Sequence, residues 1–208
     1  MTRPAPQGRY GGRSAEERRA DRRARLIEAG LELFGTVGYA LSTVGRIAKT
    51  ANLSTRQYYE EFSGREALLI AVYDTIQHDA EQAVAAALAD TVGQPLSARF
   101  DAAVSAHIHS TATDLRRAKV AFVEIVGVNP SVETHRMRTR ARWTAVINAL
   151  LAGAVESGEI ADRDRRLAPS AFIGAVNGLV QDWCSTEDRP PLADVVDQLS
   201  RLATALTA

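Results

Sequence analysis

Residues 43–62, TVGRIAKTANLSTRQYYEEF, hold two short helical segments joined by a tight corner. The first segment carries four apolar residues at the i, i+3, i+4 and i+7 spacing of one helix face: Val44, Ile47, Ala48 and Ala51. Asn52 can adopt the left-handed conformation that ends a helix, and Leu53 can fill the corner behind it. Ser54 can cap the next helix. The stretch therefore predicts a helix-turn-helix whose second helix is short and ends near Phe62.

The rest of the chain shows the same helical periodicity. Of the 208 residues, 46% are hydrophobic, which is ample for a packed core, and the Gly-Asn and Asp-Gly pairs of hairpin turns are lacking. We therefore predict an all-α protein. A helix capped by Ser14 and ended by Gly35 and Gly38 precedes the helix-turn-helix. The later helices are expected at about 65–89, 96–112, 115–128, 131–157, 167–184 and 191–206.

Charge is unevenly distributed although the formal net charge is zero. The first 65 residues hold twelve Lys and Arg against seven Asp and Glu, and the remainder holds thirteen against eighteen. A basic N-terminal part suggests contact with phosphates. We expect three parts: a flexible basic arm at 1–20, a helix-turn-helix DNA-binding domain at 21–66 and a helical regulatory and dimerisation domain at 67–208. The arm contains three arginines: Arg3, Arg9 and Arg13. Either they have no role in binding, or they add contacts with phosphates or the minor groove.

Several classes of protein do not fit the sequence. The longest apolar stretches, such as AVAAALA at 83–89, are too short to span a bilayer, and no apolar signal-peptide core follows the basic N-terminus. No nucleophile elbow or phosphate loop appears, and His107 and His109 lie two residues apart, on different helix faces. The single cysteine, Cys184, cannot form an intrachain disulfide. We expect a cytoplasmic protein that is not an enzyme, without cofactor, metal or membrane partner.

Residues 26–74, LIEAGLELFGTVGYALSTVGRIAKTANLSTRQYYEEFSGREALLIAVYD, resemble the N-terminal domain of the TetR family, the tetracycline-repressor-like transcriptional regulators. The shared positions are Gly38, Tyr39, Thr43, Ile47, Ala48, Ser54, Tyr59, Phe62 and 65–68. The segments AKVAFVEIVGVNP and AFIGAVNGLVQDWCS look like the central and dimer-forming helices of one TetR subgroup. The resemblance implies a homodimeric repressor released from a palindromic operator by a small molecule. An activator, or a regulator controlled by a protein partner, would have the same fold.

Four residues depart from the family pattern. Asn52 replaces the usual glycine of the corner, and Arg56 stands where a small residue is common. Glu60 and Glu61 stand where neutral side chains are frequent. An acid there could accept a hydrogen bond from cytosine N4 or repel phosphates. We expect a solvated or intramolecular role for both acids.

The helix-turn-helix geometry suggests which residues meet DNA. The second helix enters the major groove with its N-terminal end first, so Arg56 and Gln57 are expected to read guanine and adenine in a bidentate manner. Hydroxyl groups of Thr43, Ser54 and Tyr59 would hold phosphates. The full expected set is Thr43, Ser54, Thr55, Arg56, Gln57, Tyr58, Tyr59 and Arg65, in which Tyr58 is either packed or on DNA.

The C-terminal part must hold two DNA-binding units about one helical turn of DNA, roughly 34–36 Å, or a multiple apart. The expected dimer residues are Phe172, Gly174, Gly178, Leu179, Trp183, Val195, Leu199 and Leu202, which could instead belong to the core of one chain. The family resemblance also implies an effector pocket. Its expected lining groups, each alternatively a core or interface residue, are His107, Phe122, Glu124, Trp143, Asn148 and Asn177.

Overall fold

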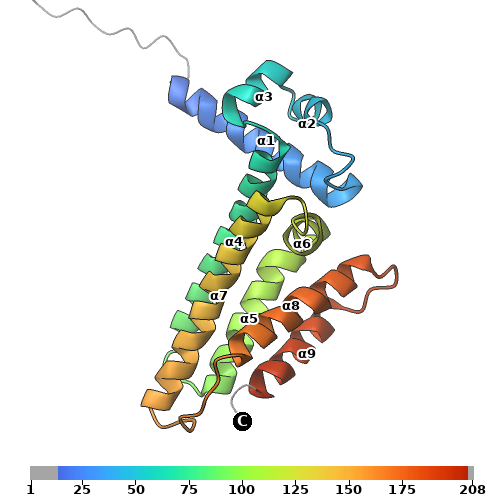
Figure 1. Ribbon diagram of the computed structural model, residues 1–208. Coiled ribbons are helices and arrows are strands. Elements are labelled where there is room, and N and C mark those ends of the chain that lie inside the picture. Colours follow the sequence, from blue (N-terminus) through green and yellow to red (C-terminus); the bar gives the residue numbers. More distant parts are fainter. Residues whose placement is uncertain (1–13, 206–208) are drawn as a thin grey trace, which may run out of the picture.

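The computed structural model describes residues 14–205, which form nine α-helices, one short π-helix and no β-strand. The helices are α1 (Ala15–Val37), α2 (Val44–Thr50), α3 (Thr55–Glu61), α4 (Arg65–Asp90), α5 (Leu96–Ala112), α6 (Leu115–Lys119), the π-helix η1 (Val120–Glu124), α7 (Pro130–Glu156), α8 (Ala168–Ser185) and α9 (Leu192–Ala205). Helices α1 to α3 form a head, and the other helices form a longer body (Figure 1). The expected all-α class is confirmed. Within residues 14–205, no helix is long and apolar enough to cross a bilayer.

Helix α4 links the two parts. It leaves the head and runs the length of the body, with α5 and α7 packed along it (Figure 1). One cluster of buried apolar side chains continues from Leu26 and Phe34 in α1, through Leu68 in α4, to Leu151 in α7. Head and body therefore share a core and are not joined by a flexible linker.

Helix α1 begins at Ala15, directly after the cap that the sequence predicts at Ser14. Ser14 and Glu17 form a capping box, in which the backbone N–H of Glu17 donates to Ser14 Oγ (3.0 Å) and the N–H of Ser14 donates to the Glu17 carboxylate (2.6 Å). The expected flexible arm at 1–20 is therefore wrong for residues 15–20, which are helical. Arg3, Arg9 and Arg13 lie outside the described residues.

The predicted corner of the helix-turn-helix is confirmed. Asn52 has a φ of 53° and is the one non-glycine residue with a positive φ among residues 14–205. The N–H of Leu53 donates to the carbonyl oxygen of Ala48 (2.8 Å), and Ser54 then caps α3. A short polar side chain tolerates the left-handed conformation, which explains asparagine in place of glycine.

Two glycines inside α1 allow neighbouring helices to approach closely. A Cβ at Gly30 would lie 3.0 Å from Val72 of α4, and a Cβ at Gly35 would lie 2.5 Å from the Cβ of Arg116 in α6. The sequence predicts that Gly35 ends the helix. Gly35 instead lies within α1, at a position where α6 packs closely against it. Gly38, with a φ of 88°, is the residue that ends α1.

The helix expected at 115–128 is divided. Helix α6 changes at Val120 into η1, and the chain turns after Glu124. A π-helix turn is wider than an α-helical turn and is frequent at functional sites. It also rotates the side chains that follow it, so the regular helical spacing of the sequence does not predict where these side chains point.

We expect Gly35→Ala to lower the free energy of unfolding by roughly 1–3 kcal/mol, because a methyl group would overlap the backbone of α6. Gly153→Ala is a matched control in α7, where nothing lies within 4 Å of an added Cβ, and it should raise stability by up to about 1 kcal/mol. Urea unfolding followed by circular dichroism measures both. Equal stability of the two variants would contradict the close packing of α1 on α6.

Candidate DNA interface and effector cavity

Helix α3 begins with a second capping box. The N–H of Gln57 donates to Ser54 Oγ (3.2 Å), and Gln57 Oε1 accepts from the N–H of Ser54 (2.9 Å) and from its hydroxyl (3.2 Å). A bidentate contact with adenine requires both the oxygen and the nitrogen of the glutamine amide. The adenine contact expected of Gln57 would therefore require breaking this cap.

Tyr58 is a core residue and not a DNA contact. Its side chain is fully buried, its hydroxyl donates to the carbonyl oxygen of Gly64 (3.1 Å), and its ring lies against Phe62. Burial raises the pKa of its phenol well above the ordinary value. The assignment of Tyr58 to the DNA-binding set is corrected accordingly, because α3 turns this position towards α1 and α4.

Arg65 makes contacts within the head that the sequence does not predict. Its guanidinium donates to the carbonyl oxygens of Tyr39 (3.1 Å) and Ser42 (3.2 Å) and lies over the Tyr39 ring, 4.7 Å from its centroid. It thus joins the start of α4 to the loop between α1 and α2. The guanidinium supports the corner of the head through Nη1, and its expected contact with DNA stays a prediction. Thr43 is exposed and caps α2, since its Oγ1 accepts from the N–H of Arg46 (3.3 Å).

Arginines of α1 form ion pairs and ring contacts that hold α3 in place. The carboxylate of Glu61, whose side chain is 1% exposed, accepts from Arg19 (3.2 Å) and Arg22 (3.0 Å). Arg23 lies over the ring of Phe62, 4.4 Å from its centroid, and Arg25 donates to the carbonyl oxygen of Asn52 at the end of α2 (2.8 Å). The basic face of α1 therefore partly faces inward. The intramolecular role expected for Glu61 is confirmed.

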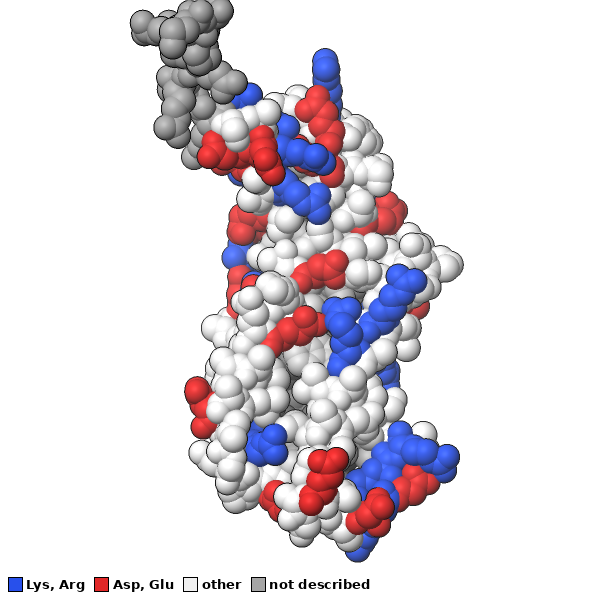
Figure 2. Space-filling model, turned by 90° about the vertical axis from the view of Figure 1, so that its left-hand side faces the viewer, with Lys and Arg blue, Asp and Glu red and all other residues white. Residues whose placement is uncertain are grey.

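Because many arginines of the head are paired with acids, the surface of the head is mixed in charge. Basic and acidic side chains lie next to one another at the head end of the molecule, without a uniformly basic surface on this side (Figure 2). Arg56 remains exposed on α3, with 90% of its side chain accessible, and it pairs with Glu60 (3.3 Å). Tyr59 is also exposed. The intramolecular role expected for Glu60 is confirmed for the free protein.

The body contains a cavity of about 90 Å³ between α4, α5, η1, α7 and α8. It is lined mainly by apolar side chains, and it includes four residues of the predicted ligand set: His107, Phe122, Trp143 and Asn177. Gln77, Arg136 and Arg140 also line it and were not predicted. Helical spacing gave no signal for them, because α4 and α7 carry several polar and charged residues around these positions and the spacing does not show which of them face the cavity.

Two residues of the predicted ligand set lie elsewhere. Asn148 is exposed on the outer side of α7. Glu124 lies at the junction of head and body, where its carboxylate accepts a hydrogen bond from the N–H of Tyr39 (2.7 Å). Both corrections have the same origin: a polar residue among apolar ones marks a special position, but it does not show on which side of the helix that position lies.

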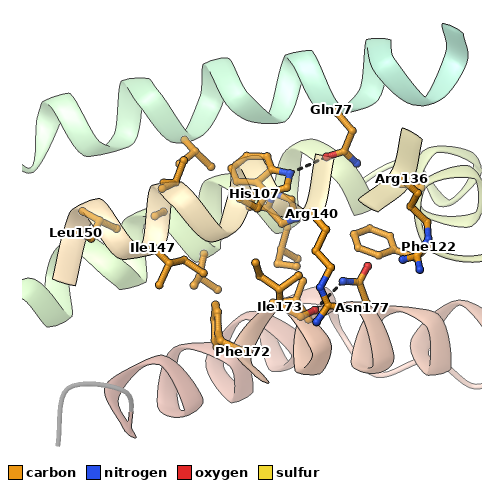
Figure 3. A pocket seen from close by; sticks show the side chains of 18 of the residues that line it. Gln77, His107, Phe122, Arg136, Arg140, Ile147, Leu150, Phe172, Ile173 and Asn177 are labelled. Atoms are coloured by element: carbon orange, nitrogen blue, oxygen red, sulfur yellow. Dashed lines mark hydrogen bonds between the residues drawn. The ribbon is translucent and has the colours of Figure 1, made fainter. Parts of the chain in front are cut away.

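The polar groups of the cavity gather towards one end. Figure 3 shows Gln77, Arg136, Arg140 and Asn177 near Phe122, whereas Ile147 and Leu150 lie towards the other end. The indole N–H of Trp143 donates to Gln77 Oε1 (2.8 Å), and Arg140 donates to the carbonyl oxygen and hydroxyl of Ser170 (2.9 and 3.0 Å). Arg136 is paired with Glu133 (2.6 Å). No carboxylate in the described part of the chain pairs with Arg140.

His107 is held between two aromatic rings. Its ring centroid lies 4.7 Å from that of Trp143 and 6.4 Å from that of Phe122, in edge-on arrangements. Its Nδ1 is buried and has no hydrogen-bond partner among residues 14–205. Burial disfavours the charged imidazolium and lowers the pKa of His107 to about 4, so the imidazole is neutral at neutral pH.

The predicted dimer residues divide into two groups. Phe172, Val195 and Leu199 are buried within the single chain, so their assignment to an interface is corrected. Gly174 and Gly178 are exposed on α8, Leu202 is exposed on α9, and Leu179 and Trp183 are partly buried. Each amphipathic helix turns its larger apolar residues towards its own core, and small residues remain on the outer face of α8.

A capped helix-turn-helix head on a helical body with a cavity between its helices defines a class, the one-component DNA-binding regulators. Residues 26–72 match the family model of bacterial regulatory proteins of the tetR family, and residues 93–207 match that of tetracyclin repressor-like C-terminal domains. The chain belongs to the TetR family of DNA-binding transcriptional regulators, whose members are regulators and not enzymes. The resemblance seen at 26–74 is thereby confirmed.

Known relatives extend over most of the chain. It is 23% identical over 181 residues to the HTH-type transcriptional regulator SrpR of Pseudomonas putida. The aligned region covers 80% of this chain and 77% of that protein. It is 22% identical over 186 residues to the fatty acid metabolism regulator protein of Bacillus subtilis strain 168, with 85% and 91% covered. The crystal structure of FadR from Bacillus subtilis in complex with stearoyl-CoA has a similar fold, with a TM-score of 0.76, 21% identity, and 89% of this chain and 99% of that chain covered.

We expect Glu61→Ala to lower the free energy of unfolding by roughly 1–3 kcal/mol, because Arg22 would lose its partner in a partly buried place. Glu60→Ala is the matched control on the same helix, where the exposed pair with Arg56 contributes at most about 0.5 kcal/mol. Thermal and urea unfolding without DNA measure the difference. Equal effects at the two positions would show that the contacts of Glu61 with α1 do not stabilise the head.

The low pKa of His107 makes stability depend on pH. The imidazole of His107 has a lower pKa in the folded state than in an unfolded chain. The unfolded state therefore binds more protons between about pH 6.5 and pH 4. The free energy of unfolding should therefore fall as the pH decreases through this window, by up to about 3 kcal/mol from this group. We expect His107→Phe to flatten the slope, whereas His109→Gln, at an exposed position of the same helix, should leave it in place.

Proposed function

We propose that this protein is a homodimeric repressor that binds an inverted-repeat operator and leaves it when a small molecule enters the body cavity. The observation that carries ligand control is the position of η1. Phe122 of this π-helix lines the cavity, and Glu124, two residues later, holds the N–H of Tyr39 in the head (2.7 Å). One short element thus contacts both the effector cavity and the DNA-binding part.

The size of the cavity supports a change of shape on binding. Sites for drug-sized ligands usually have volumes of about 300–1,000 Å³, whereas this cavity has about 90 Å³. A ligand of that size can be enclosed only if the walls, among them Phe122, are displaced. A ligand changes a conformational equilibrium only through its different affinities for the two states, and a ligand that fits only the opened cavity meets this condition.

The lining suggests the chemistry of the ligand. An apolar end and a polar end favour an elongated amphipathic molecule (Figure 3). Arg140, which lacks a carboxylate partner among the described residues, suits an anionic head group, and the imidazole of His107 offers a neutral hydrogen-bonding group. We infer a long-chain acyl compound. The complex of the FadR neighbour with stearoyl-CoA supports this choice.

The outer face of α8 supports dimerisation. Ala171, Gly174 and Gly178 are exposed at helical spacing, and small residues allow two helices to approach closely. Leu202 of α9 adds an exposed apolar side chain. An interface of α8 and α9 with the same helices of a second copy would form a four-helix contact.

The function can be tested by fluorescence polarisation with an operator selected from random duplexes. We expect two heads per inverted repeat and a release by stearoyl-CoA or stearate that weakens operator binding roughly 5- to 150-fold, the usual range of allosteric coupling. If the protein forms a dimer and binds the operator but no acyl compound releases it, the proposed control by a long-chain acyl compound is wrong.

Glu124→Ala tests the path from cavity to head. It should reduce the effect of the ligand on operator binding to less than about threefold, since the contact of η1 with the head is lost. Glu159→Ala is the matched control, because it removes a carboxylate that accepts from the N–H of Leu96 in the body and not in the head. Full ligand response in Glu124→Ala would contradict the role of η1.

A further inference from the structure

The described contacts of α3 show which of its side chains are free to meet bases. Ser54 and Gln57 are joined in the capping box, Tyr58 is buried, and Glu61 is held by two arginines. Four other residues of α3 remain exposed: Thr55, Arg56, Tyr59 and Glu60. Their spacing of i, i+1, i+4 and i+5 places them on one face of the helix. This reading face is therefore composed differently from the set that the sequence predicts.

Arg56 and Glu60 form a pair across the reading face. The distance between Arg56 Nε and Glu60 Oε1 is 3.3 Å, and 90% and 44% of their side chains are accessible. An exposed pair four residues apart contributes little to stability, so bases can separate it at little cost. Its partners in DNA are defined by chemistry, because guanine O6 and N7 accept from an arginine and cytosine N4 donates to a carboxylate.

We infer that Arg56 and Glu60 together determine operator specificity, with Arg56 reading a guanine and Glu60 a cytosine. Side chains four residues apart on a helix start about 5–6 Å apart, and base pairs stack about every 3.4 Å. Each operator half-site should therefore contain two G·C pairs that are adjacent or one step apart. Glu60 replaces Gln57 as the second base-reading residue.

The charge of Glu60 has a second consequence. A carboxylate in the groove is repelled by the phosphates wherever no cytosine N4 faces it, so it disfavours other sequences as well as favouring its own. Glu61 does not act in this way, because its carboxylate is 1% exposed and paired with Arg19 and Arg22. The two neighbouring acids thus have separate functions, one in reading and one in support of the helix.

The test is a selection from random duplexes with ligand-free wild type, Arg56→Ala and Glu60→Gln, followed by affinity measurements on single-base variants of the selected site. We expect Glu60→Gln to lose roughly 5- to 150-fold discrimination at one C·G position and to keep the preference at the guanine read by Arg56. Arg56→Ala should show the opposite pattern. Glu60→Gln should also bind unrelated DNA more tightly.

Glu16→Gln is the charge-matched control, since it removes one negative charge from the exposed first turn of α1 and leaves α3 unchanged. It should alter no base preference. If Glu60→Gln keeps every base preference and tightens binding to all sequences equally, Glu60 only repels phosphate and the inference is wrong. The inference rests on operator binding by the proposed dimer. A wild type that selects no site would overturn both, whereas a wild type that selects a site but does not respond to ligand would overturn ligand control alone.

Discussion

The close approach of α1 to α4 and α6 is the constraint on which the arrangement of head and body depends. Glycine at positions 30 and 35 brings the helix backbones together, with the side chains of Val72 and Arg116 filling the places where a methyl group would stand. Arg116 also reaches Glu32 of α1 (2.7 Å). Because these contacts join one continuous core, the head cannot rotate freely on the body. A movement in the body can therefore change the position of α3.

Charged side chains of α1 also make the head rigid. The excess of arginine in the first 65 residues suggests a phosphate-binding surface, yet Arg19, Arg22 and Arg25 are used to hold α3 and the end of α2. Hydrogen bonds to charged groups are about twice as strong as those between neutral groups. The orientation of the reading face is thus fixed within the head before DNA is met, and this lowers the entropy lost on binding.

The cavity combines an apolar lining with a few polar groups, one of which, His107, has a buried nitrogen without a partner among residues 14–205. His107 Nδ1 has no partner among residues 14–205, and its imidazole is kept neutral by burial. A buried polar group without a partner has an energetic cost, which a hydrogen bond with a ligand would remove. The same element that closes this end of the cavity, η1, carries Glu124 to the head. A segment of five residues thus contacts both the cavity and the head, and we propose that it couples the two.

Local patterns in the sequence determined the helices, the capped corner at Asn52 and the identity of the DNA-binding helix, because periodicity, caps and turn residues act within a few positions of the chain. They did not determine the partners of Tyr58, Glu61 or Glu124. These depend on how helices far apart in the sequence approach, and a polar residue fits a ligand, a neighbouring helix or water equally well until its surroundings are known. The tertiary structure alone decided which charges face inward and which, like those of Arg56 and Glu60, stay exposed.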